Sequence, residues 1–157
     1  MTRARLIVVA TTALLLVLTA PDPVSAAGRG FHLTLPDWAF TSGTCIQPGP
    51  DDTCVVAAVQ ADGTVAGTLG TGAYHADLVV DFSAGGTCNT VDESDTFAFA
   101  QGTLFVHSLH QDCRVHGNRI FTDFAIVGGT GVYAGAAGSG LEFGNSGAPI
   151  TYNGRFD

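Results

Sequence analysis

The sequence contains no lysine, and this absence restricts what the protein can bind. Once a predicted leader of 26 residues is removed, four arginines stand against thirteen of the fourteen acidic residues, which gives a formal charge of −9. A strongly acidic surface repels the phosphates of nucleic acids and of anionic membranes. We therefore expect a soluble protein that binds neither nucleic acid nor, after leader removal, a membrane.

The motifs of common enzyme and metal sites are also missing. There is no Cys-x-x-Cys pair for zinc, no Gly-x-Ser-x-Gly nucleophile motif, and no phosphate-binding loop or dinucleotide fingerprint. His107 and His110 lie three residues apart, so on a strand they point to opposite faces and cannot share an ion. The acidic segments 51–52 and 92–95 lack the full calcium-loop pattern, and we interpret them as solvated turns. We expect neither a metal nor a cofactor.

The N-terminal segment predicts export. Arg3 and Arg5 precede an apolar or small-residue run over 6–20, and Val24-Ser25-Ala26 supplies the small residues of a cleavage site. A retained anchor is the weaker interpretation, because the run is shorter than the roughly 20 residues needed to span a bilayer. We expect residues 1–26 to be a signal peptide, the mature protein to be secreted and extracellular, and residues 27–157 to form one domain.

The four cysteines predict two disulfides, because an even number in an exported chain is typical of a disulfide framework. They are Cys45, Cys54, Cys88 and Cys113. Three pairings are possible. The first two cysteines enclose a short loop that is easily closed, and the last two flank a predicted hairpin over 96–110. We therefore expect the pairs 45–54 and 88–113.

Short alternating runs separated by Gly, Asp and Asn predict an all-β fold, and no helical periodicity is sustained. Asp62-Gly63 is the strongest hairpin signal in the chain. About eight antiparallel strands can close into a barrel and so remove their exposed edges. A two-sheet sandwich is the alternative. The runs lie at residues 31–35, 55–60, 64–69, 74–82, 96–100, 102–110, 118–127, 139–143 and 150–156.

A glycine-rich segment over 123–141 carries a resemblance to a known family. An apolar strand leads into Gly-Gly-Thr-Gly at 128–131, Tyr133 follows, and three further glycines come before the next strand. This order is similar to the GGTG-x-aromatic-x-Gly-Ala-x-Gly segment of the allene oxide cyclase-like and dirigent-like β-barrel proteins, and it indicates an exported, bacterial-type member. The resemblance favours the eight-stranded barrel over the sandwich. It also implies an apolar ligand cavity, no cofactor, and a dimer or trimer.

The matching segment belongs to the scaffold, so the resemblance transfers no catalytic residue. His107 and Asp123 are weak catalytic candidates, because each is a polar residue on an otherwise apolar stripe. As a pair they could position a carbonyl or move a proton. The stronger alternative places both side chains on the surface. Glu142 and Tyr152 could line the mouth of a barrel, although we expect them on the surface as well.

Ligand contacts are expected from the aromatic side chains of the predicted strands. The candidates are Phe97, Phe99, Phe105, Phe124 and Tyr133, of which Tyr133 is more readily explained by core packing. Allene oxide cyclases close a ring in an unstable epoxide, and dirigent-like proteins guide the coupling of radicals. The resemblance therefore implies a barrel that binds or stereochemically guides a small apolar ligand. If the protein is an enzyme, it is a cofactor-free cyclase or isomerase.

A structural or interaction module is the alternative function. In that case the barrel would be filled with side chains and would have no cavity. An exposed apolar patch would carry the binding, and we would expect it around Phe31, Trp38 and Phe40. The sequence leaves open whether the protein is an enzyme and which ligand it takes.

Overall fold

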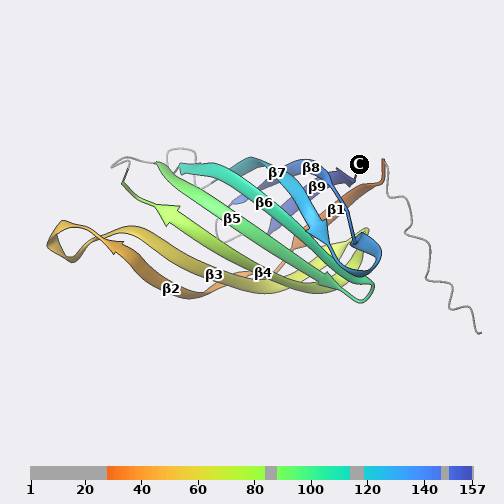
Figure 1. The fold of residues 1–157 in the computed structure, drawn as a ribbon, viewed down its shortest axis with the longest axis horizontal. Helices are drawn as coiled ribbons and strands as arrows, with labels where there is room; N and C mark the ends of the chain where they lie inside the picture. Colours follow the sequence, from red (N-terminus) through yellow and green to blue (C-terminus); the bar gives the residue numbers. More distant parts are fainter. Residues whose placement is uncertain (1–27, 84–87, 114–118, 146–148, 157) are drawn as a thin grey trace, which may run out of the picture.

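The structure, a computed structural model, describes residues 28–83, 88–113, 119–145 and 149–156, so the predicted signal peptide lies outside it. These residues are almost entirely β-strand, which confirms the all-β prediction (Figure 1). The two described helices are three-residue 3₁₀ turns, and neither is long and apolar enough to cross a membrane. The strands are β1 (Gly30–Leu35), β2 (Ala39–Pro48), β3 (Cys54–Gly67), β4 (Gly70–Asp81), β5 (Cys88–Phe99), β6 (Gly102–Cys113), β7 (Arg119–Gly129), β8 (Gly138–Asn145) and β9 (Ile150–Phe156).

Eight of these strands form a closed antiparallel barrel. From β3 to β9 each strand pairs with the next along the chain, and β9 pairs with β1. The ring closes where β1 meets the end of β3, with Leu33 opposite Gly67 and Thr34 opposite Ala66. The predicted barrel is confirmed, and the two-sheet sandwich is not what the chain forms. Closure leaves these strands without free edges, which is the usual reason for an all-β chain to curl on itself.

Strand β2 is the ninth strand and lies outside the ring. It pairs with the first part of β3, and the two extend together beyond the barrel at the left of Figure 1. A disulfide joins Cys45 to Cys54 across this extension, with 5.7 Å between the Cα atoms, which confirms the first predicted pair. Cys88 stands opposite Cys113 in the β5–β6 register. Because the Cys113 side chain lies outside the described residues, the second pair stays a prediction.

The hairpin predicted at Asp62-Gly63 is wrong. Strand β3 passes straight through both residues, and the turn to β4 falls at Thr68 and Leu69. A Cβ atom on Gly63 would lie 2.8 Å from the Cα of Trp38, so glycine permits a close approach of the segment that leads into β2. The Asp62 carboxylate accepts a hydrogen bond from the Thr41 hydroxyl at 2.7 Å. Asp62 and Gly63 therefore form part of the contact between β3 and the segment that leads into β2, and they do not form a turn.

One end of the barrel is filled with aromatic rings. Their centroids lie between 5.0 and 6.2 Å apart, within the range of favourable ring contacts. The glycine-rich segment forms the 3₁₀ turn η3 (Gly131–Tyr133) between β7 and β8, and Gly131 adopts a φ of +59° that suits glycine. This turn inserts the Tyr133 ring between Phe99 and Phe156. The clustered rings are Phe31, Phe97, Phe99, Phe124, Tyr133, Tyr152 and Phe156.

Candidate functional site: a cavity with buried carboxyl groups

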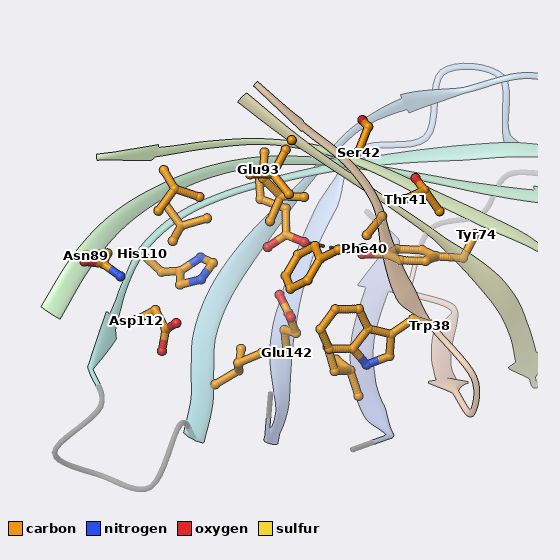
Figure 2. Close-up of a pocket in the computed structure, with 18 of the residues that line it drawn as sticks. Trp38, Phe40, Thr41, Ser42, Tyr74, Asn89, Glu93, His110, Asp112 and Glu142 are labelled. Carbon is orange, nitrogen blue, oxygen red and sulfur yellow. Dashed lines mark hydrogen bonds between the residues drawn. The ribbon is translucent and has the colours of Figure 1, made fainter. Parts of the chain in front are cut away.

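The opposite end of the barrel holds a cavity of about 570 Å³ that is open to solvent on one side, where Phe40 and Phe82 are partly exposed (Figure 2). This end is the one reached by the last residues of β4, β6 and β8. The volume falls inside the roughly 300–1,000 Å³ range of small-molecule pockets. Most of the lining is apolar, with aromatic rings contributed from the side of β2. The apolar lining comprises Trp38, Phe40, Val59, Ala61, Leu78, Val80, Phe82, Val91, Ile120 and Ile150.

Three carboxyl groups are buried inside the barrel. Glu93 and Asp95 lie on β5 with 6% and 1% of their surface exposed, and Glu142 on β8 is fully buried. The alternation of a strand explains the first two, because every second residue from Val91 to Phe99 points inward. Glu93 and Glu142 line the cavity, whereas Asp95 is not among its lining residues. Figure 2 shows the Glu93 and Glu142 side chains directed toward one another.

Two tyrosines supply the hydrogen bonds to this cluster. The Tyr74 hydroxyl lies 3.1 Å from Asp95 Oδ1 and 3.4 Å from Glu93 Oε1, and the Tyr152 hydroxyl donates to Asp95 Oδ2 at 3.2 Å. Each hydroxyl has a single proton to donate, so the tyrosines serve mainly Asp95. Both carboxyl oxygens of Glu142 are buried, and no donor in the described part of the chain meets hydrogen-bond geometry with them. The Tyr152 hydroxyl lies near enough to lower the pKa of Glu142, but its one proton is donated to Asp95, so Glu142 at the cavity wall has no donor of its own.

Burial raises the pKa of all three carboxyl groups, because a charge is poorly solvated inside the barrel. For Asp95, the neighbouring charges of Glu93 and Glu142 raise the pKa further, and Glu93 does the same for Glu142. The closeness of Glu93 and Asp95 couples the two carboxyl groups, and it acts to lower the pKa of Glu93 and to raise that of Asp95. The cluster therefore holds protons at pH values where exposed carboxyl groups have lost theirs.

The basic group at the cavity wall does not neutralise this acidity. His110 lines the cavity together with Asp112, and no arginine lines it within the described ranges. Burial lowers the pKa of His110, and the charge of Asp112 opposes that effect only in part. The Oδ1 atom of Asp112 is itself buried without a hydrogen-bond partner. The polar part of the cavity is therefore acidic or neutral, and rich in unpaired oxygen atoms.

His107 and Asp123, the predicted catalytic pair, lie outside this cavity. The His107 ring is on the outer face of β6, and its Nε2 atom contacts Asp92 Oδ1 at 2.8 Å. Asp123 is exposed on β7, between the inward-pointing Thr122 and Phe124. Both side chains therefore lie on the outer surface of the barrel, as the stronger alternative expected. The His107 ring contacts Asp92 and not Asp123, so His107 and Asp123 do not form the expected catalytic pair.

The five predicted ligand contacts do not line the cavity either. Phe97, Phe99, Phe124 and Tyr133 belong to the packed aromatic end. Phe105 is flanked by the buried Leu104 and Val106, so its side chain faces the outside of β6. As ligand contacts these residues stay predictions, because the 570 Å³ cavity lies elsewhere, and Tyr133 lines another pocket, a smaller one of about 230 Å³ beside Phe156.

The interpretation of segment 92–95 as a solvated turn is wrong, because the segment forms the middle of β5. A period-two signal was present in the sequence, since Val91, Glu93, Asp95, Phe97 and Phe99 follow one stripe. Because two residues of that stripe are charged, the pattern did not predict a buried strand. The expected surface placement of Glu142 and Tyr152 is likewise wrong: both are fully buried, and they are register partners on β8 and β9.

No protein-family model matches this chain, and no curated protein matches it. The resemblance to the allene oxide cyclase-like and dirigent-like barrels therefore stays an expectation. Within the described part of the chain, no group of three His, Cys, Asp or Glu side chains is arranged to hold a metal ion. The function has to be argued from the cavity and its carboxyl groups.

Proposed function

We propose that this protein is a secreted barrel, similar to the allene oxide cyclase-like and dirigent-like proteins, that binds a small and mainly apolar molecule. The observation that carries the proposal is the 570 Å³ cavity, whose wall is a little more than half apolar and whose deepest polar groups are the buried Glu93, Glu142 and Tyr74. Apolar walls supply most of the binding free energy in such sites, and a few polar groups fix the orientation of the ligand. Export is supported by the N-terminal segment and by the disulfide.

The buried carboxyl groups give the cavity a chemical capability as well. A protonated carboxyl group can donate a hydrogen bond, or a proton, to an oxygen atom of the ligand. Glu142 and Glu93 reach the cavity from opposite strands, so a ligand between them would be held in one orientation. This arrangement suits stereochemical guidance, and it also suits a cofactor-free isomerisation or cyclisation that begins with proton donation.

The interaction module is less well supported. Its filled barrel disagrees with the cavity, and its expected patch is only partly present: Phe31 is buried and Trp38 packs against the core, whereas Phe40 is 59% exposed. A different apolar strip lies on the outer face of β7 and β8, where Phe121 and Phe143 are register partners with 73% and 39% exposure. We propose this strip as the contact of the dimer or trimer. Light scattering should show a smaller species for Phe121→Ser, and an unchanged mass would count against it.

Ligand binding can be tested through Trp38, the single tryptophan of the sequence, which lines the cavity. N-phenyl-1-naphthylamine is a suitable neutral apolar probe, because it accepts excitation energy from tryptophan. We expect a saturable transfer of Trp38 emission to the probe. Val80→Phe narrows the cavity and should weaken binding by about tenfold or more, since probe and side chain compete for the same volume.

Val79→Phe is the matched control, because Val79 is the neighbouring residue on β4 and its side chain is 43% exposed and absent from the cavity wall. It should bind the probe as the unaltered protein does. Equal affinities for both variants would locate the probe outside the cavity. Failure of the unaltered protein to bind this probe and related apolar compounds would contradict the proposed function.

A further inference from the structure

We propose that the cavity selects organic cations, namely primary or secondary ammonium groups carried on an apolar body, with Glu142 as the counter-ion. This inference rests on the proposed function, since it names the class of ligand that the same cavity takes. Three observations support it, and each concerns a different part of the cavity wall.

The first observation is the sign of the ionisable groups. Glu93, Glu142 and Asp112 line the cavity, and among the residues that the structure describes no arginine does. Asp95 lies behind the wall within reach of the same tyrosines. A cation beside these carboxyl groups favours their ionised form, whereas an anion adds a like charge and disfavours it, so the cavity accommodates positive charge more readily than negative charge. Fatty acids and other carboxylate ligands are therefore poor occupants.

The second observation is the set of unpartnered oxygen atoms. Both carboxyl oxygens of Glu142 and the Oδ1 atom of Asp112 are buried without a donor. An unmade hydrogen bond on a buried polar atom is costly, and a donor-rich ligand removes that cost. A primary ammonium group has three N–H donors, as the lysine side chain does. A ligand carbonyl only accepts, and would leave at least one Glu142 oxygen unpaired.

The third observation is the aromatic side of the cavity. Trp38 and Phe40 meet edge to face, with 5.2 Å between the ring centroids, and both line the cavity beside Tyr74. In Figure 2 these rings lie on the same side of the cavity as the Glu142 carboxyl group. Aromatic faces attract cations, tryptophan most strongly. An ammonium group at Glu142 would therefore have a carboxylate and aromatic rings around it.

Binding of this kind exchanges a proton. In the empty barrel Glu142 keeps its proton, because burial raises its pKa. When an ammonium ion arrives, the carboxyl proton leaves to the solvent, the ammonium ion keeps all of its own protons, and the charge inside the barrel stays the same. The groups that act on the Glu142 carboxyl are Glu93 from β5 and Tyr152 from β9; Asp95 and Tyr74 belong to the same buried cluster, and His110 and Asp112 from β6 line the same cavity.

The test is isothermal titration calorimetry with 2-phenylethylamine and its neutral counterpart 2-phenylethanol, at neutral pH in two buffers of different ionisation enthalpy. We expect the amine to bind about tenfold more tightly than the alcohol. We also expect the amine to release about one proton, seen as a buffer-dependent enthalpy, and the alcohol to release none. Glu142→Gln should retain the alcohol, while the preference for the amine and the proton release disappear.

Asp123→Asn, which removes an exposed acid from the outer face of β7, is the control and should behave as the unaltered protein. Equal or tighter binding of the alcohol, or amine binding without proton release in the unaltered protein, would overturn this inference alone. Both of those results need no variant, so the test holds even if Glu142→Gln fails to fold. If the amine, the alcohol and the naphthylamine probe all fail to bind, the proposed function fails as well.

Discussion

Replacing Glu142 by Gln should change how the stability of the protein depends on pH. Glu142 is fully buried in the folded barrel, and burial raises its pKa, so its carboxyl group keeps its proton to a higher pH than an exposed one does. In the unfolded chain the same carboxyl group meets water and ionises at its ordinary pKa. Glutamine has nearly the same shape and no proton to lose. The substitution therefore removes one titration and leaves the charges seen by Glu93 and Asp95 largely unchanged.

The direction and size of the effect follow from proton binding. Between the ordinary pKa and the raised one, the folded protein holds a proton that the unfolded chain has lost, so raising the pH favours unfolding. The contribution of Glu142 to stability is thus greatest below its unfolded pKa and declines as the pH rises. One proton corresponds to about 1.4 kcal/mol per pH unit. Over two pH units Glu142→Gln should gain about 2.7 kcal/mol relative to the unaltered protein, against a total stability of about 5–15 kcal/mol.

Urea unfolding of the oxidised protein, followed through Trp38 emission at several pH values from mildly acidic to neutral, measures this difference. Any constant cost of burying the amide shifts the whole curve and leaves its slope intact, so the slope is the quantity to compare. We expect the free energy of unfolding to fall less steeply with pH in Glu142→Gln. Parallel curves for the two proteins would show that Glu142 ionises alike in both states and would refute the reasoning.

Two further substitutions test the interior. Tyr152→Phe removes the hydroxyl that donates to Asp95 at 3.2 Å in a fully buried position, so the midpoint of urea unfolding should fall by an amount equivalent to about 1–2 kcal/mol; an unchanged midpoint would show that this hydrogen bond contributes nothing. Gly63→Ala places a Cβ atom 2.8 Å from the Cα of Trp38 and should shift Trp38 emission and cost about 1–3 kcal/mol. Gly43→Ala, whose Cβ would meet no atom within 4 Å, is its control, and equal effects in both variants would rule out the contact with Trp38.

The barrel was predictable because strands leave a strong period in the sequence. Alternation and frequent Gly, Asp and Asn identified most of the strands, and the count was right for closure. The role of Asp62-Gly63 was not predictable from the sequence. The same dipeptide occurs in turns and at close contacts between strands, and which of the two it forms depends on a partner distant in sequence. Here the partner is the Trp38 segment, and local propensity carries no information about it.

The candidate site was missed for a related reason. Charged residues are rarely buried without an opposite charge, so a solvated position was the reasonable expectation for Glu93, Asp95 and Glu142. The burial of Asp95 and Glu93 depends on hydroxyl donors from Tyr74 and Tyr152, whose strands lie on other parts of the ring, whereas Glu142 is buried without such a donor among the described residues. The stripe from Val91 to Phe99 held the signal, but only knowledge of the closed ring shows that its acidic members meet Glu142.

Native mass spectrometry of the mature, oxidised protein tests the central claim, that the barrel holds a small molecule, most directly. The unaltered protein and Val79→Phe should carry an added mass of a few hundred daltons that is lost on denaturation, and Val80→Phe should carry less of it. The same spectra report the number of subunits. A bare mass for the unaltered protein, unchanged after exposure to apolar amines and neutral apolar compounds, would contradict the account.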